Sequence, residues 1–422
     1  MQKTNNTIAI CGAGIAGIAT AYYLLKKQSD LKVILIDKNQ ALSFTTSKSG
    51  ENFRDFWPQQ PMTAFSSHSI ELMKNLKSEY DADAFSMNFS GYDFVSFDED
   101  KPIFPTNSQE VFDNVMEEIT NTETIRNERP CFSKKVRKIV RIKNAGNIDV
   151  YGMGMLMLSK ARELGLQLVT GEITNITKTE SDFDIKLKNN AAINANKIVI
   201  AAGPFIGHLA KMLGMELPVE NILQQKFMVP DPQKIIPTNM AFSIYADSQY
   251  LDWSEEERTF FATDKKYEWL LREFPGGLHI KPESGKIKLG WAFNTTAAQP
   301  MWEPTTSELF PQVVLKGASR FIPELADYQN NIPSPIIQYA GYYTRTKENF
   351  PLIGATQMSG VFLVGALAGY GTMSACAAGE LCSKYILDER DLPDYARYFH
   401  PLRYADSELM REINDSMSDG QL

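Results

Sequence analysis

The chain has 422 residues, of which 43% are hydrophobic and 22% are charged, an ordinary composition for a folded globular protein. This length suits two domains better than one simple core, and the net charge of −8 argues against a nucleic-acid-binding protein. The four histidines are scattered along the chain, so no metal site is predicted. The four cysteines lack zinc-like spacing, which favours reduced, packed thiols in a cytoplasmic protein.

The first 39 residues carry the strongest local pattern. Residues 7–11 are predicted to form a buried strand, residues 15–27 a helix with a basic end, and residues 31–39 a second strand that contains Asp37. Three glycines in the first turn have the spacing G-x-G-x-x-G: Gly12, Gly14 and Gly17. In a dinucleotide-binding unit the first permits a tight turn, the second lets a pyrophosphate approach, and the third packs helix on strand. The acid at the end of the second strand then binds ribose hydroxyls.

An export signal or membrane helix is the alternative interpretation of this apolar opening. A single basic residue, Lys3, precedes it, no clean cleavage site follows, and the three glycines interrupt it. We therefore expect a phosphate-binding turn and no membrane span.

The next part of the chain mixes helices and strands. Helices are predicted over residues 66–80 and 108–121, with a strand pair between them that turns at Ser90–Gly91. Residues 149–190 are predicted to form a helix, a strand and a hairpin. The helix contains three methionines that we interpret as core side chains, because no cysteine or histidine accompanies them: Met153, Met155 and Met157.

A second strand followed by a small-residue turn and a helix is predicted over residues 195–214, so the nucleotide-binding domain is discontinuous. Residues 225–335 are rich in aromatic residues and prolines and favour an antiparallel sheet. A further strand, open glycine turn and helix from about residue 374 follow, and the tail after Pro393 is expected to be a surface extension.

Residues 129–146 contain seven lysines or arginines and no acidic residue. Contact with nucleic acid is one interpretation, but the chain is acidic overall and the segment lacks interleaved aromatic residues. We favour a solvated helix face or a docking surface for an anionic partner.

Three segments together resemble the FAD-dependent amine oxidoreductases of the D-amino-acid oxidase group, which includes sarcosine oxidase and glycine oxidase. They are the first strand–helix–strand unit, "IVIAAGP" at 198–204 and "FLVGALAGYGTMSACAAGE" at 362–380. The resemblance implies an α/β fold in which a Rossmann-like FAD-binding domain is interleaved with an antiparallel-sheet substrate domain. The implied segments are 1–90, 146–224 and 336–390 for the first domain, 91–145 and 225–335 for the second, and 391–422 for a C-terminal extension.

The resemblance also implies FAD and a set of residues around it; the FAD is expected to be non-covalent, because glycine replaces the tethering cysteine at position 341. The pyrophosphate would be bound by Gly12, Gly14, Ala16 and Gly17, the ribose by Asp37 and Lys38, and the flavin phosphates by Thr46 and Ser47. Ile173 matches the position that faces the adenine, and Ala202 and Gly203 form a turn beside the cofactor. The flavin pyrimidine would face Gly369, Tyr370, Gly371, Thr372 and Met373, where a helix N-terminus suits the negative charge of the reduced flavin.

Three further residues are matched to catalysis. Lys288, in "GKIKLGW", matches a lysine held over the flavin that assists the reaction with oxygen, since a fixed ammonium stabilises developing negative charge. The alternative is a solvated lysine on an edge strand, where lysine blocks further pairing. Arg54 is a candidate for binding an anionic substrate group, or for a structural ion pair with a neighbouring acid. Of the two adjacent tyrosines, Tyr342 and Tyr343, only one can face the substrate because strand side chains alternate, and the resemblance favours Tyr343.

The sequence departs from the sarcosine oxidase pattern at three positions. Gly341 stands where that type carries the cysteine that tethers the flavin, Met373 where it carries a lysine that binds the substrate carboxylate, and Ala292 where it carries a histidine. The resemblance therefore supports amine chemistry more strongly than a preference for amino acids.

The implied reaction is oxidation of a C–N bond in an amine or amino acid. A hydride passes to flavin N5, the imine hydrolyses, and oxygen reoxidises the flavin with release of peroxide. One alternative is a dehydrogenase that passes electrons to a quinone or a protein. Another is a flavin-bound partner protein without catalytic activity.

Overall fold

The computed structural model describes residues 7–80, 83–104 and 115–416. Its first elements are β1 (Thr7–Cys11), α1 (Ile15–Lys27) and β2 (Lys32–Asp37), and the two strands pair in parallel. Their bounds match the expected strand–helix–strand unit to within a residue or two. Both strands are buried except at the ends of β2, which accounts for their continuous apolar character.

A six-stranded sheet is built around this unit in the order β19-β20-β13-β1-β2-β9. Its pairs are parallel except for β19 and β20. The added strands are β9 (Gln167–Thr170), β13 (Lys197–Ile200), β19 (Leu352–Ala355) and β20 (Val361–Gly365). Because segments far apart in the chain supply these strands, the nucleotide-binding unit is discontinuous in sequence.

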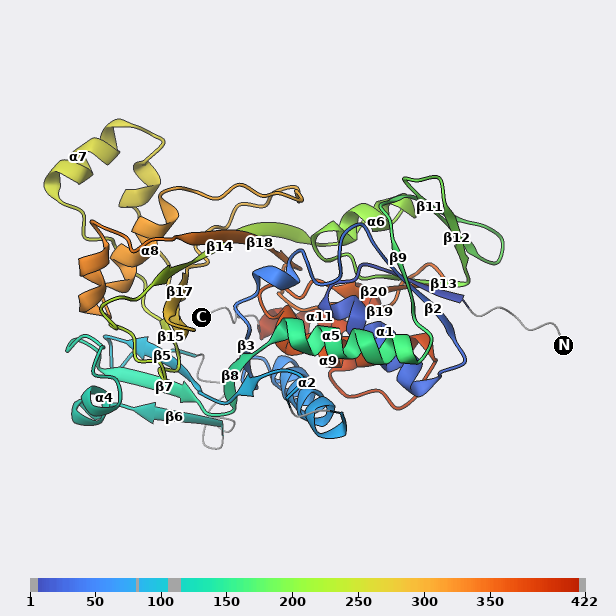
Figure 1. Ribbon diagram of the computed structural model, residues 1–422, viewed down its shortest axis with the longest axis horizontal. Coiled ribbons are helices and arrows are strands. Elements are labelled where there is room, and N and C mark those ends of the chain that lie inside the picture. Colours follow the sequence, from blue (N-terminus) through green and yellow to red (C-terminus); the bar gives the residue numbers. More distant parts are fainter. Residues whose placement is uncertain (1–6, 81–82, 105–114, 417–422) are drawn as a thin grey trace.

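Alternate residues of β1 pack into two different cores. Ile8 and Ile10 join the helices α1, α2 (Gln60–Glu79), α5 (Val150–Glu163) and α9 (Gly371–Ile386), whereas Ala9 and Cys11 face the opposite core. That second core is covered by α6 (Ile206–Met212) and by a small sheet of β10 (Ile173–Lys178), β11 (Phe183–Leu187) and β12 (Ala192–Ala195). The sheet is therefore covered on both faces, as Figure 1 shows at the right.

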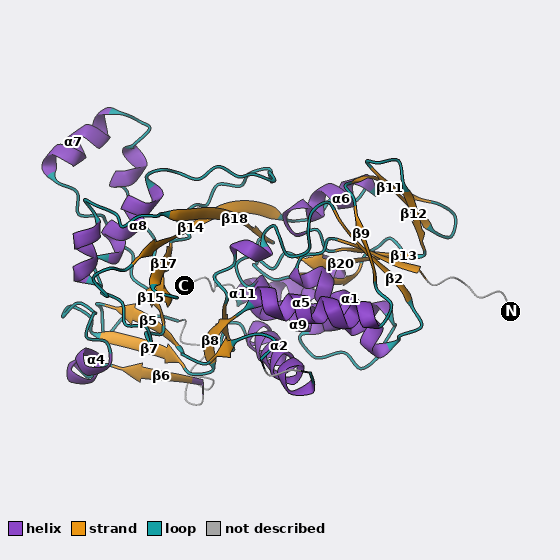
Figure 2. Cartoon of the chain, viewed as in Figure 1, coloured by secondary structure: helices purple, strands orange, loops and turns teal. Residues whose placement is uncertain are grey.

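The other half of the molecule is an eight-stranded sheet in the order β18-β14-β17-β16-β15-β5-β7-β6, antiparallel except for the pair β5 and β15. Its strands are β5 (Tyr92–Ser96), β6 (Met116–Ile119), β7 (Lys138–Ile142), β14 (Glu220–Pro230), β15 (Phe242–Tyr245), β16 (Leu278–Glu283), β17 (Lys286–Gly290) and β18 (Ile337–Arg345). Helix α8 (Phe310–Ala318) packs on this sheet and shares its core. Figure 2 shows β14 and β18 reaching from this sheet toward the other half.

The remaining elements are short. A three-stranded sheet contains β3 (Asn52–Arg54), β8 (Ala145–Ile148) and β4 (Met87–Asn88). Among the described residues, the other α-helices are α4 (Thr122–Glu128), α7 (Glu255–Thr263), α10 (Ala396–Phe399) and α11 (Ser407–Asp415). Strand β14 crosses the expected domain boundary at residues 224 and 225, and β18 pairs with it. The exact division into domains stays a proposal.

Two expectations for residues 85–121 are wrong. Strands β4 and β5 do not pair with each other, because β4 pairs with β8 while β5 pairs with β7 and β15. Residues 116–119 of the expected helix form strand β6 at the edge of the large sheet, since β7 offers them a pairing partner. The other half of that helix, up to residue 114, lies outside the described residues.

The basic segment 129–146 is not a solvated helix face. It contains β7 and β8, and two of its arginines bind the fully buried Asp93: Arg129 Nε lies 2.6 Å and Arg141 Nε 2.7 Å from its carboxylate oxygens. Lys138 is also buried and donates to backbone carbonyls. Arg129, Arg141 and Lys138 therefore bind internal groups, whereas the other four basic residues of the segment are exposed.

The C-terminal segment is not a surface extension either. Tyr395, Phe399, Leu409 and Ile413 are buried and join the core around α1 and α9, and Arg403 is buried as well. The apolar positions of α10 and α11 therefore complete the core of the nucleotide-binding half.

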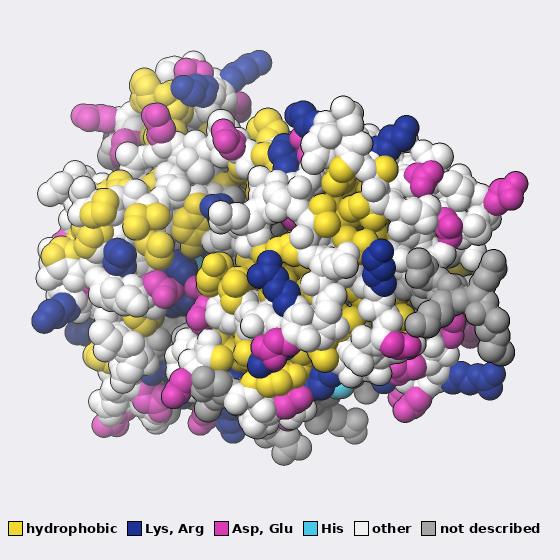
Figure 3. All heavy atoms as spheres, turned by 45° about the vertical axis from the view of Figure 1, so that its right-hand side comes forward, with side chains coloured by type: hydrophobic (Ala, Val, Ile, Leu, Met, Phe, Trp, Pro, Cys, Tyr) yellow, Lys and Arg dark blue, Asp and Glu magenta, His cyan; other side chains and the backbone are white. Residues whose placement is uncertain are grey.

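The surface of the molecule carries both charged and apolar side chains (Figure 3). On the face in Figure 3, acidic and basic side chains are interspersed and apolar side chains gather near the middle.

No helix in the described parts of the chain is long and apolar enough to cross a membrane. All four cysteines are buried free thiols, and among the described residues no group of three or more potential ligands could hold a metal ion.

Candidate cofactor and active site

A cavity of about 830 Å³ lies where the two halves meet. Its walls come from the carboxyl ends of β1, β2, β13 and β20, from the N-termini of α1 and α9, and from strands β14 and β18. In a parallel α/β sheet this end is where ligands bind, because the helix N-termini and open loops converge there. The cavity is large enough for a dinucleotide and a small substrate.

Glycine is present at the three positions of the first turn for different structural reasons. Gly12 has φ of +120°, and a Cβ there would lie 2.3 Å from the carbonyl oxygen of Ala201. A Cβ at Gly17 would lie 2.0 Å from the carbonyl oxygen of Gly12. At Gly14, however, the nearest atom to a Cβ would be Thr46 Oγ1 at an ordinary 3.5 Å. The fold itself therefore requires Gly12 and Gly17, whereas Gly14 leaves free space in the cavity.

The N-terminus of α1 opens into that space. Gly14 is the N-cap and no side chain caps the helix, although Thr46 Oγ1 accepts from the amide of Ile15 at 3.2 Å. The hydroxyl of Thr45, in the same wall, is buried without a hydrogen-bond partner in the described structure. Unsatisfied donors at a helix N-terminus attract phosphate. These residues therefore fit the pyrophosphate of a dinucleotide.

Asp37, at the end of β2, accepts a hydrogen bond from the glycine turn. Its carboxylate accepts from the amides of Ala13 at 2.7 Å and Asn39 at 2.9 Å. Burial raises the pKa of Asp37, and the backbone donors oppose that shift only in part. The neighbouring Lys38 contacts Glu172 at 3.3 Å and lies 4.9 Å from the ring centre of Trp302. Asp37 thus fixes the glycine turn as well as lining the cavity.

The second helix N-terminus belongs to α9. Its N-cap, Tyr370, supplies no side-chain cap, and Ser49 Oγ and Thr372 Oγ1 lie 2.6 Å apart beside it. The ring of Tyr343 packs against Gly369, where a Cβ would lie 2.6 Å from Tyr343 Cζ. This end of the cavity is therefore lined by the Tyr343 ring, by the backbone at Gly369 and Gly371, and by the small side chains of Ser49 and Thr372.

Most of the expected cofactor residues line this cavity: Gly12, Gly14, Ala16, Asp37, Lys38, Thr46, Ile173, Ala202, Gly203, Gly369, Gly371 and Thr372. The others are not among the residues that line it: Gly17, Ser47, Tyr370 and Met373. Ser47 donates to the carbonyl of Phe44, and Tyr370 donates to that of Asn349. Their contact with a cofactor stays a prediction.

Lys288 is not a solvated edge lysine. Its strand, β17, lies between β14 and β16, and the side chain is buried. Its Nζ lies 2.9 Å from Glu283 and 3.7 Å from Glu51, and it is not among the residues that line the cavity. Burial alone would lower the pKa of Lys288, but Tyr339 and these two carboxylates outweigh burial and raise it.

Arg54 and the two tyrosines also have defined environments. Arg54 is buried at the end of β3, with its guanidinium carbon 4.4 Å from the Trp57 ring centre. Tyr343 packs on the cavity wall at Gly369, whereas the hydroxyl of Tyr342 accepts from the amide of Met301 at 3.0 Å. The two tyrosines therefore point in opposite directions, as strand alternation predicts.

Sequence reasoning missed two features of the cavity. One is Lys226 on β14, a single lysine in an otherwise ordinary strand. The other is the loop 291–309, which Figure 1 shows running above β18 toward α6. Its Trp302 stacks on Phe205 at 4.3 Å and contacts Phe44 at 4.9 Å between ring centres. Only the prolines and the tryptophans of this segment hinted at an ordered loop.

A glycine turn at α1, an uncapped N-terminus at α9 and an antiparallel sheet around one cavity define a dinucleotide-dependent oxidoreductase. The chain belongs to the FAD-dependent oxidoreductase family DAO, whose sequence model matches residues 7–385. FAD is accordingly its cofactor, and the uncapped helix ends and open space at Gly14 fit that molecule.

The sequence identity to individual curated relatives is low. The chain is 23% identical to human mitochondrial dimethylglycine dehydrogenase over 91% of its own length but only 43% of that protein. It is 24% identical to the sarcosine oxidase subunit beta of Rhodobacter capsulatus over 55% of its length and 58% of that subunit. It thus spans less than half of the first of these curated relatives.

Solved structures cover the whole fold. L-proline dehydrogenase from P. horikoshii matches with a TM-score of 0.74 and 21% identity over 95% of this chain and 98% of that one. Glycine oxidase from Geobacillus kaustophilus matches with a TM-score of 0.73 and 16% identity over 94% and 98%. At these identities the likeness establishes the fold.

Proposed function

We propose that the protein oxidises a C–N bond of an amine or amino acid with non-covalently bound FAD. The cavity between the two halves carries this proposal, because it joins the phosphate-binding turn at Gly14 to a wall formed by β14 and β18. The relatives named for dimethylglycine, sarcosine, proline and glycine support the same substrate class.

The chain would hold FAD at three places. The α1 N-terminus at Gly14 binds the pyrophosphate, Asp37 the ribose, and the α9 N-terminus at Gly371 the pyrimidine side of the flavin. FAD held there would supply a two-electron acceptor for the hydride lost from the α-carbon of a neutral amine, whose imine product would hydrolyse in water. Because Gly341 replaces a tethering cysteine, the flavin dissociates on denaturation.

Side chains near the α9 end position the substrate. Tyr343 supplies an aromatic wall and a hydroxyl. Arg54 is buried against Trp57 and is not among the residues that line the cavity, so its role in binding an anionic substrate group rests on the family resemblance. Removal of a hydride from a neutral amine needs no strong side-chain base. The family resemblance assigns an electrostatic role at the flavin to Lys288, but its pairing with Glu283 and Glu51 argues against that role.

Oxygen is the proposed electron acceptor, with release of peroxide. A quinone or protein acceptor is the second candidate, which the dehydrogenases among the relatives favour. A cytoplasmic location, suggested by the four free thiols, belongs to the same proposal.

Anaerobic bleaching of the bound flavin tests the function. The purified protein is expected to be yellow and to release unmodified FAD in acid. A panel of sarcosine, dimethylglycine, glycine, proline and both series of amino acids should contain at least one compound that bleaches it. Readmitted air then separates the acceptors, since an oxidase gives about one peroxide per turnover whereas a dehydrogenase reduces dyes instead. Flavin that stays oxidised with every amine would support a non-catalytic partner protein and overturn the proposal.

A further inference from the structure

Lys226 is placed to reach the end of the cavity where α9 begins. It lies on β14, between Tyr339 of β18 and Gly290 of β17 in the strand register. Its side chain lines the cavity, and its Nζ lies 5.5 Å from the ring centre of Tyr343. Because Tyr343 packs on Gly369, the ammonium group shares this end of the cavity with the α9 N-terminus.

Two glycines make room for the Lys226 side chain. A Cβ at Gly290 would lie 3.0 Å from Lys226 Cγ, and one at Gly50 would lie 3.7 Å from Lys226 Cε. The Gly290 position also faces Nε2 of His279, which is buried and has no hydrogen-bond partner in the described structure. The lysine stem therefore passes between backbone segments toward the cavity rather than toward bulk solvent.

The charges of the neighbouring lysines are compensated, whereas that of Lys226 is not. Lys288 and Lys281 both contact Glu283, at 2.9 Å and 3.2 Å, and Lys288 also faces Glu51. Within the described parts of the chain, no carboxylate lies within ion-pair distance of Lys226. Burial, together with the Lys226 and Lys281 ammonium groups, lowers the pKa of His279 to about 3, so the imidazole adds no charge at neutral pH.

We propose that Lys226, rather than Lys288, is the cation that acts at the flavin end of the cavity and raises the reduction potential of the bound flavin. This inference rests on the proposed function, in which the flavin ring lies against the α9 N-terminus. A lysine without a counter-ion stabilises the added negative charge of the reduced cofactor, whereas a lysine between two carboxylates has little net effect. The cluster of Lys281, Glu283 and Lys288 then fixes strands β16 and β17 behind it.

The reduction potential of the bound flavin tests this assignment without any substrate. Lys226→Met keeps a similar volume and removes the charge. It should lower the equilibrium constant for two-electron reduction at least tenfold, equal to about 30 mV. Lys226→Arg should restore most of the potential. Lys288→Met and the matched control Lys286→Met, on the same strand, should each change the constant less than threefold.

The measured potentials distinguish a role of Lys226 from a role of Lys288 and from no role of either lysine. A potential that falls in Lys288→Met but not in Lys226→Met would overturn the inference and return the role to Lys288. Equal potentials in all variants would overturn it as well and leave the proposed function intact. A wild-type protein that binds no FAD would overturn the proposed function together with this inference. If Lys226→Met retains less FAD than the wild type, Lys226→Gln provides the neutral variant for the same measurement.

Discussion

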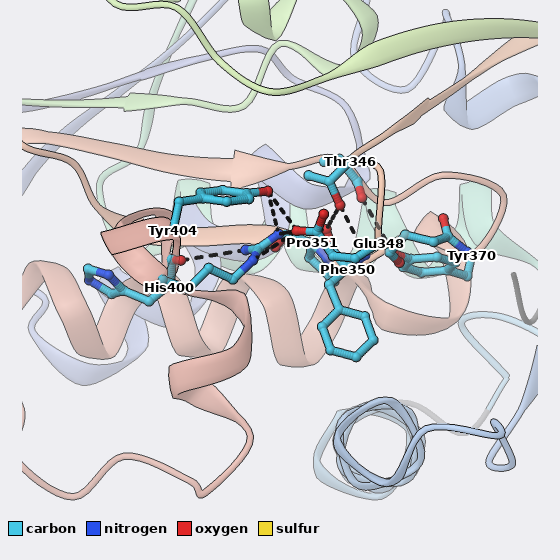
Figure 4. A network of polar contacts seen from close by, with 10 residues as sticks. Thr346, Glu348, Phe350, Pro351, Tyr370, His400 and Tyr404 are labelled. Atoms are coloured by element: carbon cyan, nitrogen blue, oxygen red, sulfur yellow. Dashed lines mark hydrogen bonds and ion pairs between the residues drawn. The ribbon is translucent and has the colours of Figure 1, made fainter. Parts of the chain in front are cut away.

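Arg403 forms a buried ion pair that ties the C-terminal segment to the loop after β18. The side chains of Arg403 and Glu348 are 0% and 4% exposed, and Arg403 Nε donates to Glu348 Oε1 at 3.0 Å. Nη1 of the same arginine donates to the carbonyl of Pro351 at 2.8 Å, and the Tyr404 hydroxyl donates to Glu348 at 2.6 Å, as Figure 4 shows. All three guanidinium nitrogens of Arg403 thus donate within the protein.

The substitution Arg403→Met should therefore destabilise the folded protein strongly. Removing one partner of a buried pair leaves the other charge uncompensated and costs about 3–5 kcal/mol. An unfolding entropy of about 2.1 cal/mol/K per residue gives about 0.9 kcal/mol/K for this chain, so Tm should fall by about 3–6 °C. The matched control is Arg397→Met, whose pair with Glu412 is 61% and 51% exposed, and exposed pairs contribute about 0–1 kcal/mol.

Thermal melting of the holoprotein, followed by circular dichroism, measures both variants. The double variant Arg403→Met/Glu348→Met should recover part of the loss, because it removes both charges. A Tm for Arg403→Met within 1 °C of that for Arg397→Met would refute the reasoning from burial.

Three further predictions concern the cavity and its surroundings. Because the pKa of His279 is about 3 rather than 6.5, the unfolded chain binds a proton in this range that the folded chain does not. Acidification from pH 6.5 to 4 should thus destabilise the wild type more than His279→Gln, by up to about 1.4 kcal/mol per pH unit, and parallel Tm profiles would contradict this. Gly14→Val should abolish FAD binding with little change in the fold, while Asp37→Ala weakens it less; flavin content and circular dichroism check both. Trp302→Ala removes an aromatic stack beside the cavity that is worth about 0.5–1.5 kcal/mol, so FAD should dissociate roughly two- to tenfold faster. The dissociation rate is measured from flavin fluorescence on dilution, and an unchanged rate would contradict the prediction.

The nucleotide-binding turn could be predicted from sequence because its determinants are local. Gly12, Gly14, Gly17 and Asp37 lie within 26 residues, and the strand–helix–strand register follows from apolar periodicity alone. The glycine-rich start of α9 was likewise visible as a strand that runs into an open turn.

The placement of the lysines near the α9 end of the cavity depends on strand pairing across long sequence separations. Lys226 and Lys288 lie on neighbouring strands, and the register that opposes Lys226 to Gly290 decides which ammonium group reaches the cavity. A motif match to "GKIKLGW" gives the strand but does not reveal Glu51 and Glu283, which approach Lys288 from other elements. The same limit applies to the basic segment, whose partner Asp93 lies on a different strand.

Helix α9 contacts α1 near the start of the chain, and its N-cap contacts the loop that the C-terminal segment binds. A Cβ at Gly379 would lie 2.5 Å from the backbone of Ala19, so α1 and α9 pack at close distance and align their N-termini toward one cavity. On the other side, the Tyr370 hydroxyl donates to the carbonyl of Asn349, next to the Glu348 that binds Arg403. The family match ends at residue 385, yet the segment beyond it supplies this arginine. The C-terminal segment therefore holds the loop after β18 to which Tyr370, the N-cap of α9, is bonded.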